Sequence, residues 1–192
     1  KYFGDVELNP ELKATTDIEC VKGADIVLLA VPTIAIDPIC HQINDLLEKK
    51  TIIINVSKGF HPETNERMSQ VIRRCIDEDK LSSVVSLIGP SHAEEVAFDI
   101  PTTVLTSSNN MKIAEEVQDL FMTKTFRVYT NDDLIGVEVG GAVKNIIALA
   151  AGVCDGLGYG DNTKAALMTR GMAEIVRIGT KLGGRVASRF SP

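Results

Sequence analysis

Short apolar runs alternate along the first two thirds of the chain with longer segments whose apolar residues recur at helical spacing. The apolar runs are rich in valine, isoleucine and threonine, which is typical of β-strands. They predict five strands, at 25–31, 51–56, 83–89, 102–107 and 126–130. The segments between them predict helices near 34–48, 63–78, 91–98 and 110–122. This βαβαβαβαβ order predicts a largely parallel, twisted sheet that is covered by helices.

The pattern changes after the fifth predicted strand. Strand signals stop, and two long helical segments follow, near 133–153 and 162–182, joined by the glycine-rich sequence DGLGYG. We therefore predict an α/β domain over residues 1–130 and a helical domain over residues 131–192. No Pro/Ser-rich linker separates the two, so we expect them to pack firmly on each other.

Composition narrows the function classes. The 192 residues include 44% hydrophobic and 24% charged residues, which is ordinary for a soluble globular protein. No apolar run approaches the roughly 18 residues that suggest a membrane span, so we expect none. A formal charge of −6 and a pI near 5.1 argue against a general nucleic-acid binder. A local basic pocket for a small anion is compatible with this charge, and we expect a small-molecule ligand.

The spacing of the cysteines and histidines argues against disulfide bonds and metal sites. The four cysteines are widely spaced and form no CxxC motif, and no signal peptide is recognised at Lys1, so we predict reduced thiols and a cytoplasmic location. The histidines show no metal-ligand spacing with one another or with the cysteines, so no metal site is predicted. These residues are Cys20, Cys40, Cys75, Cys154, His41, His61 and His92.

The most informative segment runs from 136 to 160 and places Lys144 and Asn145 inside an apolar, glycine-laced helix. Helical periodicity puts Glu138, Gly141 and Asn145 on one narrow arc, with Lys144 at its edge. Adjacent glycines inside a helix suggest the close approach of another backbone or of a ligand. Burial lowers the pKa of a lysine toward the range that is useful for proton transfer, so we interpret Lys144 as a chemical group. The alternative is a lysine that snorkels from a tightly packed helix pair.

Ligands of open α/β sheets bind outside the carboxyl ends of the strands, so the loops that follow the strands are candidates for a site. Pro32 follows the first predicted strand, Lys58 and Gly59 follow the second, and Gly89 and Ser91 follow the third. Lys58 can present a positive charge to a phosphate or a carbonyl oxygen, although an isolated loop lysine is usually only solvated.

The segment GPSHAEEV, residues 89–96, predicts a helix start. Ser91 and Glu94 have the spacing of a capping box, in which the serine accepts from the backbone of Glu94 and the glutamate reaches back to the cap. The free N–H groups of such a helix start also suit an anion or a cofactor, with Gly89 permitting close approach. Both interpretations can hold together.

Four segments taken together closely resemble the NAD(P)-dependent glycerol-3-phosphate dehydrogenase family: VSKGF at 56–60, GPSHAEEV at 89–96, the stretch 126–152 with its GGAVKN motif, and DGLGYGDNTKAALMTRG at 155–171. The resemblance runs collinearly from about residue 8 to residue 184. It implies a Rossmann-like dinucleotide-binding domain followed by a helical substrate domain. It also implies interconversion of dihydroxyacetone phosphate and sn-glycerol 3-phosphate by hydride transfer with NAD or NADP, in glycerophospholipid synthesis.

The resemblance assigns roles to six residues, and the place of a seventh, Pro32, after the first predicted strand suggests that it contacts the cofactor. In reduction Lys144 would donate a proton to the carbonyl, and Asn145 would help to position the reacting oxygen. The binding residues would be Lys58 for substrate and cofactor, Gly89 and Ser91 for substrate, and Ala93 and Pro32 for cofactor.

The chain departs from the family pattern at both ends. It opens at KYFGDVELNPELKATTDI, without the GxGxxG unit that cradles the pyrophosphate, and closes on GGRVASRFSP, without the family's substrate-phosphate-binding Arg-Asn pair. We therefore expect the first βαβ unit to be missing and the helical domain to be incomplete. The residue that would discriminate NAD from NADP precedes Lys1.

Two other functions and the oligomeric state stay open. One alternative is a related two-domain dehydrogenase of hydroxy acids or sugar acids. The other is a non-catalytic fragment, or an interaction module, whose glycine-rich helix packs against a partner. The resemblance is compatible with a homodimer.

Overall fold

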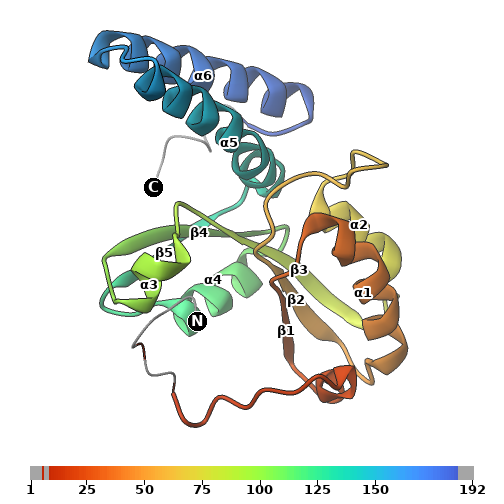
Figure 1. Cartoon of the computed structure of the whole chain (residues 1–192). Coiled ribbons are helices and arrows are strands. Elements are labelled where there is room, and N and C mark those ends of the chain that lie inside the picture. The colour runs from red at the N-terminus through yellow and green to blue at the C-terminus, as the bar shows by residue number, and fades with distance from the viewer. Residues whose placement is uncertain (1–5, 7–8, 186–192) are drawn as a thin grey trace.

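The computed structural model describes residue 6 and residues 9–185, and it folds into a five-stranded sheet covered by helices, with a helix pair at one end (Figure 1). The strands are β1 Ile26–Leu29, β2 Thr51–Asn55, β3 Leu81–Ile88, β4 Thr102–Ser108 and β5 Phe126–Asn131. The helices are the 3-10 turn η1 Ile18–Val21, α1 Thr33–Leu46, α2 Met68–Cys75, α3 Ala93–Ala97, α4 Met111–Phe121, α5 Leu134–Gly156 and α6 Asp161–Lys181. Each predicted strand and helix is present.

The strands lie side by side in the order β1-β2-β3-β4-β5. β1, β2 and β3 are parallel to one another, and β4 is parallel to β5. β3 and β4 are antiparallel, with Val85 opposite Ser108 and Ile88 opposite Leu105. The prediction of a mostly parallel sheet is confirmed, with one reversal: the short helix α3 turns the chain straight back. The carboxyl ends of β1, β2 and β3 therefore share one edge of the sheet.

Both faces of the sheet are buried, as the unbroken apolar runs predict. Side chains of neighbouring residues point to opposite faces, so Ile53 and Val84 belong to one apolar cluster and Ile54 and Val85 belong to the other. The first cluster lies under α1 and α2 and includes Ile36, Cys40, Val71 and Ile72. The second lies under α4 and includes Val117.

One helix boundary differs clearly from the prediction. Helix α2 begins at Met68, whereas the pattern predicted a start near 63. The residues before it form a loop that is closed by a β-bridge between Phe60 and Arg67, and Asn65 adopts a left-handed backbone conformation with φ of 57°. Residues 63–67 of this loop are all polar and are exposed or half-buried, so the amphipathic period begins only at Met68.

Helices α5 and α6 pack side by side and project from the sheet (Figure 1). The two helices touch closely, because a Cβ built on Gly171 would lie 2.6 Å from Cδ1 of Ile147. The outer part of the pair carries exposed apolar side chains, among them Ile146, Leu149 and Val153.

Helix α5 is also long and apolar enough to cross a membrane, judged by length and composition alone. Its mean hydropathy is 1.6, and a third of its most apolar window is buried inside the protein. The expectation of no membrane span rested on the lack of an uninterrupted apolar run, since Glu138, Lys144 and Asn145 interrupt this segment. Core helices of soluble proteins pass the same test.

Candidate active site

The loops that follow β1 and β2 contact each other at the shared edge of the sheet. Ser57 donates a hydrogen bond from its hydroxyl to the carbonyl oxygen of Val31. Gly59 has a φ of 139°, and a Cβ built on it would lie 3.2 Å from Cγ2 of Thr33, at the start of α1. Lys58 is therefore held between two anchored neighbours, and its loop faces the first turn of α1.

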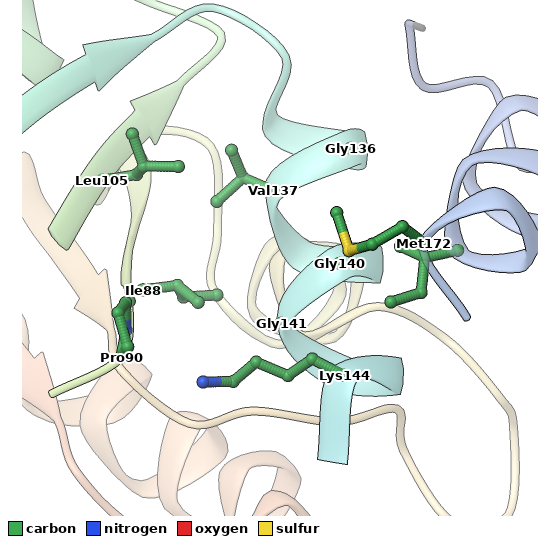
Figure 2. Close-up of a pocket in the computed structure, with 11 residues that line it drawn as sticks. Ile88, Pro90, Leu105, Gly136, Val137, Gly140, Gly141, Lys144 and Met172 are labelled. Atoms are coloured by element: carbon green, nitrogen blue, oxygen red, sulfur yellow. The ribbon is translucent and has the colours of Figure 1, made fainter. Parts of the chain in front are cut away.

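A pocket of about 290 Å³ lies between the end of β3 and helix α5. Gly89 and Pro90 line it from the loop after β3, and Gly140 and Lys144 line it from α5. Figure 2 shows the Lys144 side chain extending from α5 toward the turn at Pro90. The predicted helix position thus brings the Lys144 amine to the carboxyl end of the sheet. The side chain is half-buried.

The two adjacent glycines of α5 have different surroundings. A Cβ on Gly141 would lie 2.7 Å from Cγ2 of Ile88, so this glycine lets the helix pack directly on the end of β3. A Cβ on Gly140 would meet nothing within 4 Å. The prediction was the approach of a backbone or of a ligand; Gly141 is instead approached by the Ile88 side chain of the sheet, and Gly140 has no close neighbour.

Gly89 is enclosed by backbone. A Cβ at this position would lie 2.7 Å from the carbonyl oxygen of Thr103 and 2.7 Å from Cα of Val104. Neither atom can move without disturbing the pairing of β3 with β4.

We expect Gly89→Ala to lower the free energy of unfolding by about 1–3 kcal/mol, because the added methyl group overpacks against backbone. Urea denaturation of the purified chain measures this change. The matched control is Gly140→Ala, which adds a methyl group to open space within a helix and is expected to raise stability by about 1 kcal/mol. Equal effects of the two substitutions would contradict this interpretation.

A second pocket, of about 340 Å³, borders the loops that follow β2 and β3. Lys58, Ser91 and Ala93 line it, which brings together three of the residues predicted to bind ligands. Burial lowers the pKa of Lys58, and the positive charge of Lys144 lowers it further. The two ammonium groups therefore act on each other. Among the described residues neither of them has a hydrogen-bond or ion-pair partner. Such a pair suits an anionic or strongly polar oxygen between them.

Two of the predicted site residues lie apart from these pockets. Asn145 is exposed, because it sits one helical position, about 100°, beyond Lys144. Pro32 is also exposed and forms the N-cap of α1. Neither residue lines the two pockets described above.

The predicted capping box of Ser91 and Glu94 is wrong. The N-cap of α3 is His92, and no side chain caps the helix. The Glu94 carboxylate instead lies 2.7 Å from Nδ1 of His92. Helix α3 has only five residues, so its first turn offers little dipole to an anion. The local sequence has the required spacing, but the chain enters the helix one residue later than a Ser91 cap requires.

Glu138 is the residue whose role sequence reasoning missed. Its side chain is 5% exposed and lies at the start of α5. Oε2 accepts from Nη1 of Arg67 and from the hydroxyl of Ser69, both at 2.6 Å. Oε1 accepts from the backbone N–H of Ser69 at 2.8 Å and from the hydroxyl of Ser86 at 3.2 Å. These bonds tie α5 to α2 and β3. The only sequence signal was a carboxylate on the arc that includes Gly141.

Sheet topology and site together define the class of this protein, which is a Rossmann-like α/β fold with a helical C-terminal part and a crevice at the carboxyl ends of its first three strands. Sequence profiles described as the NAD-dependent glycerol-3-phosphate dehydrogenase N-terminus and C-terminus match residues 1–114 and 133–191. The chain belongs to the NAD-dependent glycerol-3-phosphate dehydrogenase family.

Individual relatives agree with this assignment. The chain is 56% identical over 191 residues to a glycerol-3-phosphate dehydrogenase [NAD(P)+] of Clostridium perfringens, which covers 99% of this chain and 57% of the relative. It is 58% identical over 180 residues to the enzyme of the same name from Clostridium acetobutylicum, covering 93% of this chain and 53% of that one. The chain therefore spans little more than half the length of these curated relatives.

Solved structures of similar proteins share the fold. A glycerol-3-phosphate dehydrogenase from Coxiella burnetii superposes with a TM-score of 0.87 at 34% identity, covering 98% of this chain and 57% of that chain. The glycerol-3-phosphate dehydrogenase of Saccharomyces cerevisiae gives a TM-score of 0.86 at 25% identity, covering 98% and 56%.

Proposed function

We propose that the full-length protein interconverts dihydroxyacetone phosphate and sn-glycerol 3-phosphate by hydride transfer with NAD or NADP. Membership of the family and the names of its relatives support this activity. The observation that carries the proposal is the convergence of Lys58 and Lys144 at the carboxyl edge of the sheet. The two side chains come from separate elements, line neighbouring pockets, and have no anionic partner among the described residues.

The described part of the crevice offers two neighbouring pockets, which suit the nicotinamide end of a dinucleotide and a small phosphorylated ketone. The pocket beside Lys58, Ser91 and Ala93 lies where the ligands of such sheets bind, and the pocket beside Gly89 and Lys144 adjoins the same edge. When bound, the nicotinamide cofactor would supply or accept the hydride. The contributions of this chain are binding, orientation and the movement of a proton.

In this mechanism Lys144 donates a proton from Nζ to the carbonyl oxygen as negative charge develops there, and takes it back in the oxidation direction. Lys144 is half-buried and lines the pocket beside Gly89, which puts its Nζ within reach of a carbonyl oxygen bound there. Lys58 contacts substrate and cofactor. Gly89 and Ser91 contact the substrate, Ala93 and Pro32 contact the cofactor, and Asn145 orients the reacting oxygen once the remaining helical domain is in place.

The direct test is an assay of the full-length protein with dihydroxyacetone phosphate and reduced NAD or NADP, followed by the nicotinamide absorbance. We expect turnover with this substrate and little with a panel of keto acids and keto sugar acids. Preference for a member of that panel would replace this activity by that of a related two-domain dehydrogenase. Absence of turnover with all of them, together with absence of cofactor binding, would favour a non-catalytic interaction module.

We expect Lys58→Met to raise KM for substrate or cofactor about tenfold or more, because a hydrogen bond to a charged group contributes about 1.5–3 kcal/mol. Steady-state kinetics of the full-length protein measure this change. The control is Lys112→Met, an exposed lysine on α4, which is expected to leave KM unchanged. A KM for Lys58→Met within twofold of the parent for both ligands would remove Lys58 from the binding site.

We further propose a cytoplasmic protein without nucleic-acid or membrane partners, and without a metal in its catalytic site. The four free cysteines support the cytoplasmic location, and the acidic net charge supports the lack of a nucleic-acid partner. The buried contact of Glu138 with Arg67 supports packing of α5 within the protein, since a carboxylate bound to the sheet domain is poorly suited to a lipid environment.

A further inference from the structure

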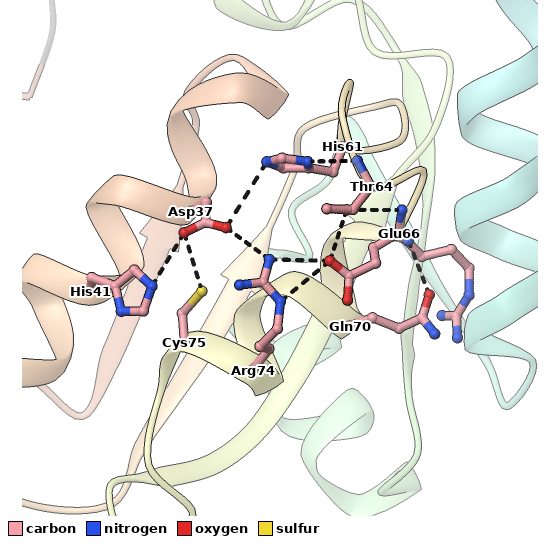
Figure 3. A network of polar contacts seen from close by, with 9 residues as sticks. Asp37, His41, His61, Thr64, Glu66, Gln70, Arg74 and Cys75 are labelled. Atoms are coloured by element: carbon pink, nitrogen blue, oxygen red, sulfur yellow. Dashed lines mark hydrogen bonds and ion pairs between the residues drawn. The ribbon is translucent and has the colours of Figure 1, made fainter.

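Three side chains with different donor atoms meet between α1 and α2. Asp37 and His41 lie one turn apart on α1, and Cys75 is the last residue of α2 (Figure 3). Oδ1 of Asp37 lies 3.2 Å from Nε2 of His41 and 3.6 Å from Sγ of Cys75. All three donor atoms lie within 4.8 Å of one another. None of these residues lines the pockets of the proposed active site.

We propose that Asp37, His41 and Cys75 form a binding site for a thiophilic divalent cation of the Zn²⁺ class, which joins α1 to α2. An imidazole nitrogen, a carboxylate oxygen and a thiolate sulfur are the three ligand types that Zn²⁺ uses in proteins. Harder cations such as Mg²⁺ prefer oxygen ligands alone and are not expected to bind here.

The spacing of the donor atoms suits such an ion. Bonds of about 2.0–2.2 Å to oxygen and nitrogen and about 2.3 Å to sulfur place the ligands of a tetrahedral zinc site about 3.3–3.7 Å apart. The separation of Oδ1 of Asp37 from Sγ of Cys75, 3.6 Å, lies in this range, and its separation from Nε2 of His41, 3.2 Å, is slightly shorter. An ion can therefore enter with rotations of the His41 and Cys75 side chains and without movement of the helices.

The neighbours of Asp37 hold its carboxylate in place. Nη2 of Arg74 lies 2.7 Å from Oδ2 of Asp37 and 3.1 Å from Oε2 of Glu66. His61 approaches the same oxygen, Oδ2, at 4.0 Å. Oδ1 of Asp37 therefore points toward His41 and Cys75. In metal sites, a hydrogen bond from a residue outside the ligand set, here Arg74, commonly orients a metal-binding carboxylate in this way. The carboxylates of Asp37 and Glu66, the guanidinium of Arg74 and Cys75 as a thiolate together carry a net charge of −2. A divalent cation neutralises this charge.

Access and proton balance are also consistent with an ion. The His41 side chain is 61% exposed, so water can reach the site and fill a fourth position. In the absence of an ion the thiol of Cys75 donates to Asp37. Binding releases that proton to solvent. Nε2 of His41 lies 3.2 Å from the Asp37 carboxylate, a contact that requires a proton on Nε2 in the absence of an ion. Binding therefore also transfers this proton through solvent to Nδ1, and Nε2 then coordinates.

The test is a titration of the chain, without a polyhistidine tag, with Co²⁺ as a spectroscopic substitute for Zn²⁺. We expect a thiolate-to-metal charge-transfer band, displaced by Zn²⁺ and unaffected by Mg²⁺. Cys75→Ser should abolish the band. His41→Gln should weaken Co²⁺ binding about tenfold or more, and it changes an exposed side chain that folding does not require.

Matched controls separate this site from adventitious binding. Cys20→Ser and His92→Gln change an exposed cysteine and an exposed histidine elsewhere in the chain, and both should retain the parent's band and affinity. Zn²⁺ should also raise the Tm of the parent and of these controls, but not that of His41→Gln. A missing thiolate band at millimolar Co²⁺, or an affinity that His41→Gln leaves unchanged, would overturn the proposal. None of these readouts depends on dehydrogenase activity.

Discussion

Lys144→Ala in the full-length protein is expected to lower kcat for reduction of dihydroxyacetone phosphate by at least about a hundredfold, as expected for the loss of a general acid. KM should change far less, because the proton is transferred in the transition state and contributes little to ground-state binding. Steady-state kinetics with saturating cofactor measure both quantities.

The control for this variant is Lys181→Ala, which removes an exposed lysine from the last turn of α6. Its kcat should equal that of the parent. An unchanged kcat for Lys144→Ala would remove the assignment of Lys144. A large rise in KM with kcat retained would instead make Lys144 a binding residue, parallel to Lys58.

The same variant has a consequence that does not depend on turnover. The positive charge of Lys144 lowers the pKa of Lys58, because a like charge disfavours a second ammonium, and burial lowers it more. Removing Lys144 should therefore raise the pKa of Lys58 while leaving it below the ordinary value of 10.5. A pH titration of isotope-labelled lysine by NMR would measure this shift. An unchanged pKa of Lys58 would show that the two amines do not act on each other.

Local pattern was sufficient for much of the fold. Apolar runs and helical spacing located all five strands and the helices, because burial on one or both faces leaves a period in the sequence. The reversal of β4 could not be read in this way, since an apolar strand has the same pattern in either direction. The start of α2 was misplaced because the polar residues 63–67, which carry no apolar period, form a loop closed by the Phe60–Arg67 bridge.

The candidate site could likewise be predicted only in part. The carboxyl-end rule, applied to Lys58 and Gly89, selected residues that line neighbouring pockets because their strands are parallel. Contacts between distant segments left no local signal. Glu138 meets Arg67 across 71 positions, and Cys75 meets Asp37 across 38. Single-sequence reasoning marks such residues as unusual but does not name their partners.

Glu138→Ala is expected to lower the free energy of unfolding by about 3–5 kcal/mol, the range measured when one partner of a buried ion pair is removed. The substitution leaves the guanidinium of Arg67, whose side chain is 15% exposed, without its carboxylate, and it also removes the acceptor of the Ser69 and Ser86 hydroxyls. Urea denaturation of the chain measures the change.

Glu174→Ala serves as the control for this prediction, since Glu174 forms ion pairs on the surface of α6 with Arg170 and Arg177. Pairs of that kind contribute about 0–1 kcal/mol. A loss for Glu138→Ala no larger than that of Glu174→Ala would show that the network does not hold α5 on the sheet. A double substitution, Glu138→Leu with Arg67→Met, should recover only part of the lost stability, because no buried charge is then left unpaired but the donors of Ser69 and Ser86 still lack their acceptor.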